Sequence, residues 1–362
     1  MRRHWQKKPL LVRGAIAGMQ PLLGRRALFD LAARDEVESR LVVRQKAGWS
    51  LRRGPFARRA IPPLTQSQWT LLVQGVDLHD DAAHTLLQRF DFVPQARLDD
   101  LMVSFATDGG GVGPHFDSYD VFLLQAQGTR RWRIGQQKDF TLKEGVPLKI
   151  LANFEPQEEH VLEPGDMLYL PPRWAHDGVA VGECQTYSIG FRAPQKGELA
   201  RELLQRLAED ADDLAGEALY RDPSQAATDA RGAVPARLVD FARDALQAAL
   251  AQPVALERAL GEYLTEPKPN VWFEGGGNGV DGLEGPVVLD RRTRMMYDAR
   301  HVFINGESLR ASGRDAALMR QLADQRRLSA AQWRRASDAA QELLASWCEA
   351  GWAHPAREEG GD

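Results

Sequence analysis

The stretch Gly-Gly-Gly-Val-Gly-Pro-His-Phe-Asp, residues 109–117, carries the strongest signal in this chain. Its glycines let the backbone turn tightly before the two polar residues. Side chains at positions i and i+2 of a strand point the same way, so we expect His115 and Asp117 to face the interior of a barrel. An H-x-D pattern alone occurs often by chance, so a metal site requires a third ligand from elsewhere.

A second motif supplies that ligand. Residues 164–176 read Pro-Gly-Asp-Met-Leu-Tyr-Leu-Pro-Pro-Arg-Trp-Ala-His, which predicts a turn, a strand, a proline-stiffened bend and then His176. Two histidines and one carboxylate on one face of a metal leave its other positions open. That donor set is typical of non-haem Fe(II) oxygenases, in which a chelating cosubstrate and O₂ take the open positions. His115, Asp117 and His176 are therefore the predicted metal ligands.

The sequence around these motifs indicates an α+β protein. Short apolar runs between about 97 and 193 alternate with glycine and proline turn signals, a pattern typical of a β-sandwich or barrel. Beyond Pro194 the chain becomes helical. Its last part combines strand-like segments, an Asn305-Gly306 hairpin signal and two helical patterns, which suggests a winged helix. The predicted strands are 69–75, 101–106, 121–124, 131–134, 167–170, 186–191, 286–289 and 301–304, and the predicted helices are 21–33, 79–90, 199–215, 234–265, 313–326 and 330–350.

These patterns divide the chain into four parts. Residues 1–84 are expected to pack on the barrel, 85–198 to form it, 199–266 to form a helical segment, and 267–362 to form the winged-helix domain. In the helical segment, an apolar stripe from Leu238 to Leu250 is compatible with one helix face. The glycine-rich stretch 275–285 is expected to be a flexible loop.

A possible cosubstrate anchor follows the first two ligands. Residues 128–133 read Gly-Thr-Arg-Arg-Trp-Arg and predict a hairpin whose second strand returns into the barrel. Arg130 and Trp132 would lie on one face, and Arg131 and Arg133 on the other. A buried arginine can bind a carboxylate through two parallel hydrogen bonds, as the far end of 2-oxoglutarate requires. Alternation alone leaves open whether these arginines face inward or into solvent.

Charge and cysteine content indicate how the N-terminal arm packs, whether disulfides form and where the protein is located. Residues 1–60 contain 15 Lys and Arg against 4 Asp and Glu, a net charge of +11, and the rest carries −15, which together give −4. The basic arm also contains Trp5, Leu10 and Ile16, so we expect it to pack on the body. Cys184 and Cys348 lie far apart and are expected to be buried free thiols. No apolar run is long enough to cross a membrane, so we expect a cytoplasmic protein.

Residues 104–191 resemble the JmjC-type oxygenases of the cupin superfamily. The resemblance rests on H-x-D, the Gly128–Trp132 segment and the Pro-Gly-Asp…Pro-Pro…His motif, and the start of the chain, residues 5–15, is similar as well. It is strongest to the bacterial ribosomal oxygenases, through residues 109–117, 119–122 and 187–194, and weaker beyond about 195. It implies a jelly-roll (double-stranded β-helix) barrel followed by a helical dimerisation segment and a winged-helix domain.

The same resemblance implies an activity. Members of this family hydroxylate an arginine of a large-subunit ribosomal protein, using Fe(II), 2-oxoglutarate and O₂. His115, Asp117 and His176 would bind iron, Arg130 would hold the distal carboxylate of 2-oxoglutarate, and Ser104 and Ser188 would help to hold cosubstrate or substrate. Thr129 departs from the basic residue typical of close members, which leaves Arg131 as an alternative anchor. The resemblance also implies a homodimer.

Other functions are compatible with the sequence. The target could be a histidine of a ribosomal protein, or the chain could be a different cupin metalloenzyme. A non-enzymatic nucleic-acid binder would need a recognition helix with a basic face. Residues 313–326 contain Arg314 and Arg320 but also Asp315 and Asp324, so direct nucleic-acid binding is not expected.

Overall fold

The computed structural model describes residues 1–46, 48–275, 285–310 and 312–356. It divides into two compact units, Met1–Ala193 and Pro194–Asp362. The predicted flexible loop at 275–285 lies almost wholly outside the described residues. Among the described residues, no helix is both long and apolar enough to cross a membrane.

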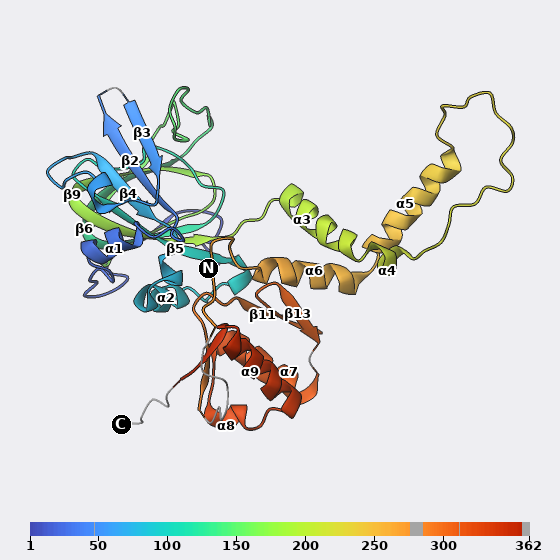
Figure 1. Ribbon diagram of the computed structural model, residues 1–362. Coiled ribbons are helices and arrows are strands. Elements are labelled where there is room, and N and C mark those ends of the chain that lie inside the picture. The colour runs from blue at the N-terminus through green and yellow to red at the C-terminus, as the bar shows by residue number, and fades with distance from the viewer. Residues whose placement is uncertain (47, 276–284, 311, 357–362) are drawn as a thin grey trace. The chain divides into compact units, whose positions relative to one another are not determined.

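The first unit is a β-barrel with short helices (Figure 1). Its elements are β1 Leu10–Val12, α1 Arg25–Leu31, β2 Ser39–Gln45, β3 Gly48–Arg53, β4 Trp69–Val73, α2 Asp81–Gln88, β5 Leu98–Ala106, β6 Val121–Gln136, β7 Glu158–Leu162, β8 Met167–Leu170 and β9 Trp174–Phe191, with single 3₁₀ turns at Arg58–Ala60, Val76–Leu78 and Gln95–Arg97. The strands pair in the order β1-β8-β6-β9-β5-β4-β2-β3, with β7 on β6. The predicted jelly-roll barrel is confirmed.

The N-terminal arm packs on this barrel, as its apolar residues predict. Strand β1 pairs antiparallel with β8. The indole of Trp5 lies against the rings of Tyr169 and Phe191, with centroids 5.8 and 5.1 Å apart. Burying such large aromatic surfaces stabilises the folded chain, so the arm is part of the barrel core.

Two local predictions in this unit are wrong. The segment that carries His115 and Asp117 is not a strand, because only His115 forms a bridge, an isolated one to His176. The predicted hairpin at Gly128 is also absent, since β6 runs through it as one strand of 16 residues. The register between β6 and β9 shifts between Gln125 and Gln127 and again between Gln127 and Thr129. A β-bulge of this kind disrupts the ladder locally while the strand continues.

The second unit contains a helical segment and a winged helix. Its helices are α3 Lys196–Glu209, α4 Ala211–Ala215, α5 Ala236–Leu250, α6 Pro253–Thr265, α7 Gly313–Gln325, α8 Ala330–Trp333 and α9 Asp338–Glu349. Its strands are β10 Val287–Leu289, β11 Met295–Tyr297, β12 His301–Ile304, β13 Glu307–Arg310, β14 Arg327–Leu328 and β15 Ala353–Pro355. Asn305 and Gly306 join β12 to β13 with φ of 48° and 92°, as the hairpin signal predicts.

The long predicted helix 234–265 is divided into two. Pro253 begins α6 directly after α5 has ended, because proline fits the first turn of a helix but not its interior. No residue of α5 is buried. Cys184 and Cys348 are buried free thiols, as predicted.

Candidate metal centre and cosubstrate pocket

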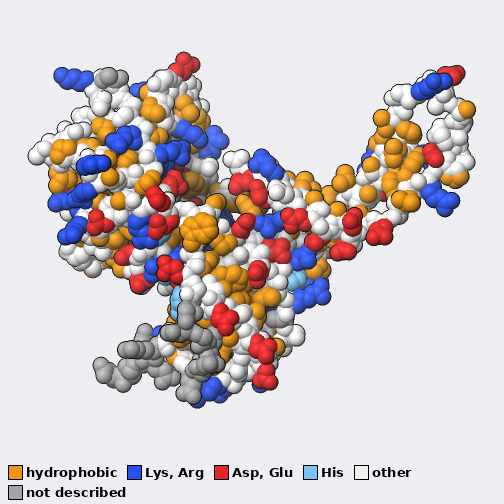
Figure 2. All heavy atoms as spheres, in the orientation of Figure 1, with side chains coloured by type: hydrophobic (Ala, Val, Ile, Leu, Met, Phe, Trp, Pro, Cys, Tyr) orange, Lys and Arg blue, Asp and Glu red, His pale blue; other side chains and the backbone are white. Residues whose placement is uncertain are grey.

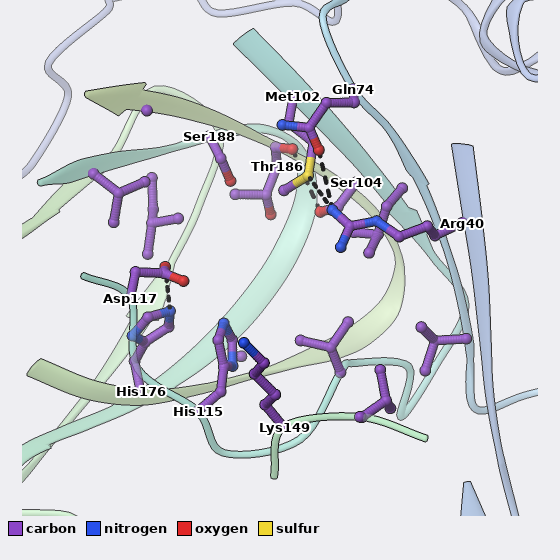
Figure 3. A pocket seen from close by; sticks show the side chains of 18 of the residues that line it. Arg40, Gln74, Met102, Ser104, His115, Asp117, Lys149, His176, Thr186 and Ser188 are labelled. Carbon is purple, nitrogen blue, oxygen red and sulfur yellow. Dashed lines mark hydrogen bonds and ion pairs between the residues drawn. The ribbon is translucent and has the colours of Figure 1, made fainter. Parts of the chain in front are cut away.

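The two motifs meet at one end of a cavity in the barrel unit. His115, Asp117 and His176 each offer a ligand atom, and these atoms all lie within 4.8 Å of one another. Figure 3 shows the three side chains pointing toward one another at one side of the cavity. The cavity has a volume of about 450 Å³, which is in the range of small-molecule sites.

Backbone pairing brings the ligands together. The N–H of His115 donates to the carbonyl of His176 at 3.0 Å, and the N–H of His176 donates to that of His115 at 2.8 Å. The turn before β9 is tied to the second ligand, since the N–H of Arg173 donates to the carbonyl of Asp117 at 2.7 Å. Three hydrogen bonds therefore join two motifs that are distant in the sequence.

The hydrogen bonds of the two rings fix their tautomers. His115 Nδ1 lies 2.9 Å from the carbonyl oxygen of Gly113, and His176 Nδ1 lies 3.0 Å from that of Trp174. A carbonyl oxygen can only accept, so each Nδ1 carries the proton and each Nε2 keeps its lone pair. His176 Nε2 lies 3.7 Å from Asp117 Oδ2. Metal-binding histidines characteristically donate from the other ring nitrogen in this way.

Electrostatics also favour a neutral His176. Burial lowers the pKa of this imidazole well below its usual range, and the neighbouring His115 lowers it further. An imidazole must be unprotonated to bind a metal. The donor set of two imidazoles and one carboxylate fits a divalent first-row metal such as Fe(II). The ligand roles themselves stay a prediction.

Arg130 occupies the same cavity, deeper in the barrel. Its side chain is 4% exposed, and its Nη1 donates to Ser104 Oγ at 2.7 Å and to Thr186 Oγ1 at 3.1 Å. Its Nε has no hydrogen-bond partner among the described residues, and no carboxylate in the described part of the chain lies within 4.0 Å of the guanidinium. A buried charge without a counter-charge is costly, so this guanidinium is suited to bind an anionic ligand.

The β-bulge explains why Arg130 and not Arg131 points inward. Val121 and Leu123 line the cavity at the start of β6, whereas Arg130 and Trp132 line it further along. Between Gln125 and Gln127 the register advances two residues on β6 but only one on β9. The extra residue reverses the alternation of the strand. Arg131 is consequently exposed.

Trp132 lies between the anchor and the metal ligands. Its ring is 5.3 Å from the Arg130 guanidinium carbon and 5.8 Å from the centroid of His176. Gly178, opposite it on β9, allows this approach, because a Cβ there would come within 2.6 Å of the indole. The indole thus packs directly beside both functional groups.

Sequence reasoning missed several residues of this cavity. The predicted Ser104 and Ser188 line it, and so do Thr186, Arg40 and Lys149, which were not predicted (Figure 3). Asp99, Asp100 and Tyr119, also not predicted, line it as well. Thr186 and Ser188 lie two residues apart on β9 and share a face, so strand alternation applied to Ser188, which the family resemblance had named, could also have found Thr186. Nothing in the sequence brings Arg40 or Lys149 near the metal ligands.

Two known protein families match this chain. A JmjC domain family matches residues 85–199, and a ROXA-like winged helix matches residues 248–354. The ribosomal protein uL16 3-hydroxylase of Escherichia coli (strain K12) is 36% identical over 275 residues, which are 74% of this chain and 71% of that protein. A probable ribosomal oxygenase of Haemophilus influenzae is 36% identical over 55% of this chain and 50% of its own length.

Solved structures are similar over nearly the whole chain. The X-ray structure of E. coli ycfD has a TM-score of 0.87 at 30% identity, with 97% of this chain and 96% of that one covered. A structure of YcfD described as a ribosomal oxygenase in complex with cobalt and 2-oxoglutarate has a TM-score of 0.82 at 30% identity, over 97% and 96% of the two chains.

Proposed function

The chain belongs to the JmjC-type ribosomal oxygenases, and we propose that it hydroxylates an arginine side chain of the large-subunit ribosomal protein uL16. The observation that carries the proposal is the shared cavity of the His115–Asp117–His176 cluster and the buried guanidinium of Arg130. Fe(II) and 2-oxoglutarate supply the oxidation, in which one atom of O₂ enters the substrate C–H bond and the other enters succinate, with release of CO₂.

The protein's own residues would bind and orient these groups. The Nε2 atoms of His115 and His176 and the carboxylate of Asp117 would hold the iron. Arg130 would pair with the distal carboxylate of 2-oxoglutarate, and Ser104 would hold the guanidinium in place from behind. The buried indole of Trp132 packs beside Arg130 and His176, and apolar surroundings of this kind strengthen charge interactions.

Acidic groups at the cavity favour a cationic substrate side chain. Asp99 and Asp100 line the cavity, and Asp100 is 3% exposed and accepts hydrogen bonds from Gln74 Nε2 and the Gly75 N–H. Burial raises the pKa of Tyr119, and so do the neighbouring Asp117 and Asp100, so its hydroxyl remains a neutral donor. A guanidinium is always charged at neutral pH, whereas a histidine is largely neutral, and this difference favours arginine.

Intact-mass comparison of ribosomal proteins from cells with and without the enzyme tests the proposal. We expect one added oxygen atom on uL16, and fragmentation should locate it on an arginine. An oxygen on a histidine of another ribosomal protein would replace the arginine assignment, and no added oxygen on any ribosomal protein would overturn the proposed substrate class. A ribosomal substrate would place the reaction in the cytoplasm.

We further propose that the chain forms a homodimer through α5. This helix exposes apolar side chains along one face, at Val239, Leu246 and Leu250, which are 44%, 66% and 50% exposed. Exposed apolar surface of this kind on a soluble protein often marks an interface. A second copy of the same helix would cover it in a symmetric contact.

A further inference from the structure

Exposed cations lie on the β2–β3 hairpin and on the loop between β6 and β7, and one of them, Lys149, lines the cavity of the metal cluster. We call this group the cationic rim: Arg44, Lys46 and Arg53 from the hairpin, and Lys143 and Lys149 from the loop between β6 and β7. All five side chains are exposed. Figure 2 shows Lys and Arg side chains gathered over the part of the barrel unit that carries β2 and β3.

The hairpin register directs part of the rim toward the cavity. Strand β2 pairs with β3 so that Val42 lies opposite Leu51 and Arg44 lies opposite Trp49. Val42 and Leu51 line the cavity. Because side chains alternate along a strand, Arg44 and Arg53 share the face of these two residues.

The loop after β6 brings the other cations to the same place. The N–H of Lys143 donates to the carbonyl of Ile150, and the N–H of Leu151 donates to that of Pro114, both at 2.8 Å. A Cβ at Gly113 would lie 3.0 Å from Ile150 Cδ1 and 3.3 Å from Trp49 Cζ2. The hairpin, the loop and the segment before His115 therefore pack against one another, beside a small cavity of about 150 Å³ that Arg44, Trp49 and Lys143 help to line.

The rim carries charge that the described protein does not neutralise. None of its five side chains forms an ion pair with a described residue, whereas nearby Arg133 pairs with Asp177 at 2.5 Å. Exposed Glu144 is the acidic residue next to Lys143 in the loop. The Arg44 guanidinium carbon lies 5.6 Å from the centroid of the Trp49 ring. Exposed cations with an aromatic ring among them are the combination that binds nucleic-acid phosphates and stacks bases.

We propose that the cationic rim binds RNA, so that the enzyme engages its ribosomal protein as part of an RNA complex. The inference rests on the proposed function. Ribosomal proteins bind RNA and are themselves cationic. The rim therefore repels the substrate protein, and its favourable ligand is a polyanion. RNA that surrounds the target protein supplies phosphates beside the cavity. This revises the expectation of no direct nucleic-acid binding, which considered the N-terminal arm and the winged helix.

Fluorescence anisotropy with a fluorescein-labelled, single-stranded RNA of about 20 nucleotides, long enough to span several phosphate contacts, tests the proposal. The test variant carries Arg44→Glu, Arg53→Glu and Lys143→Glu. The matched control carries Arg2→Glu, Arg3→Glu and Lys8→Glu, which change the net charge equally beside β1, at the opposite edge of the sheet from β3. Neither set touches the metal cluster, and the titration contains neither metal nor 2-oxoglutarate.

We expect the parent to bind RNA with an affinity that falls steeply as salt rises. The test variant should bind at least ~10-fold more weakly, and its log–log salt slope should be shallower by about 2, because three phosphate contacts are lost at roughly 0.7 each. The control should stay within about twofold of the parent, as expected for cations that make no phosphate contact. If the triple variant does not fold by circular dichroism, Arg44→Gln and Lys143→Gln singly should each reduce the slope by about 0.7.

Three results would overturn the proposal: no RNA binding by the parent, equal loss in both variants, or poly-glutamate binding as tight as RNA binding with the same sensitivity to the rim. The last would assign the rim to an acidic protein. RNA binding needs neither iron nor 2-oxoglutarate. A protein that does not bind RNA is therefore distinguishable from one that does not hydroxylate a ribosomal protein.

Discussion

Arg130 Nη1 donates a hydrogen bond to Thr186 Oγ1, and both side chains are almost completely buried. The Thr186 hydroxyl in turn donates to Gln125 Oε1 at 2.9 Å. The amide of Gln125 is oriented because its Nε2 donates to the carbonyls of Gln127 and Gly128, at 2.8 and 3.1 Å. The backbone of the bulge thus fixes the direction of every hydrogen bond as far as the guanidinium.

This series of hydrogen bonds predicts that Thr186 positions Arg130. Thr186→Val removes the hydroxyl at nearly constant volume and should weaken 2-oxoglutarate binding roughly tenfold, in line with the loss of a hydrogen bond to a charged group. Calorimetry on cobalt-loaded protein measures this affinity without turnover. Metal affinity should not change, and Thr186→Ser should restore 2-oxoglutarate binding. A merely structural role for Thr186 would instead lower thermal stability without this selective effect.

Arg130 and Arg131 provide a matched pair for the anchor itself. Arg130→Ala should raise the 2-oxoglutarate requirement by about 100-fold, because a buried charge-assisted pair is lost. Arg131→Ala removes the same charge from an exposed position and should leave the requirement within about twofold, as for an exposed charge. The measurement is the KM for 2-oxoglutarate in each variant. Equal effects in the two variants would remove Arg130 from its role.

The metal centre predicts a loss of metal binding on removal of one ligand. Asp117→Ala should weaken Co(II) or Fe(II) binding by more than ~100-fold, since even outer partners of metal ligands contribute 10- to 100-fold. Asp139→Ala, an exposed carboxylate bound within its own loop, is the control. Wild-type metal binding by purified Asp117→Ala, measured by calorimetry, would refute the assignment of the triad.

The α5 interface predicts a change of mass in solution. Leu246→Asp places a charge on the most exposed of the three apolar positions of the helix, where a desolvated carboxylate would oppose association. Light scattering should give a dimer for the parent and a monomer for the variant. Gln247→Asp, on the same helix, serves as the control. A monomeric parent would rule out the homodimer.

The lowered pKa of Asp290 predicts that the winged-helix domain loses folding stability at low pH. Burial would raise the pKa of this carboxyl, but hydrogen bonds from Arg292 and His354 outweigh it and lower the pKa to about 2. A lowered folded-state pKa stabilises the fold above the unfolded value near 3.8, and this stability is lost as pH falls through about 2. The contribution at neutral pH is about 2 kcal/mol.

Hydrogen exchange of β10 and β15, which flank Asp290, measures this effect. Asp290→Asn should expose these strands to faster exchange at neutral pH, and its difference from the parent should shrink as the pH approaches 2. A difference independent of pH would show that shape, and not charge, accounts for the destabilisation.

Local sequence patterns predicted much of this fold. The bounds of β8 and β12 match the predicted strands residue for residue, because alternation and flanking turns determine them locally. The meeting of His115 with His176 also followed, since both motifs pointed to one barrel interior. The strand expected around His115 did not form, since its pairing with β9 is limited to one bridge.

The rest depends on pairing between distant segments. The extra residue of β6 at the bulge is defined only against β9, so no local pattern separates Arg130 from Arg131. Gln125 and Thr186 are ordinary polar residues in the sequence, and their alignment on opposite strands connects them. Arg40 lines the cavity only because β2 lies beside β4 in the sheet.

The extra residue at the bulge of β6 determines which of the two arginines points into the cavity. Deletion of Ala126 would leave both arginines in the chain but bring Arg131 to the place of Arg130 and Arg133 to that of Trp132. The histidines and the aspartate lie outside β6 and would keep their places. One missing residue would thus leave an arginine at the anchor position but replace the indole beside the metal ligands with a second guanidinium.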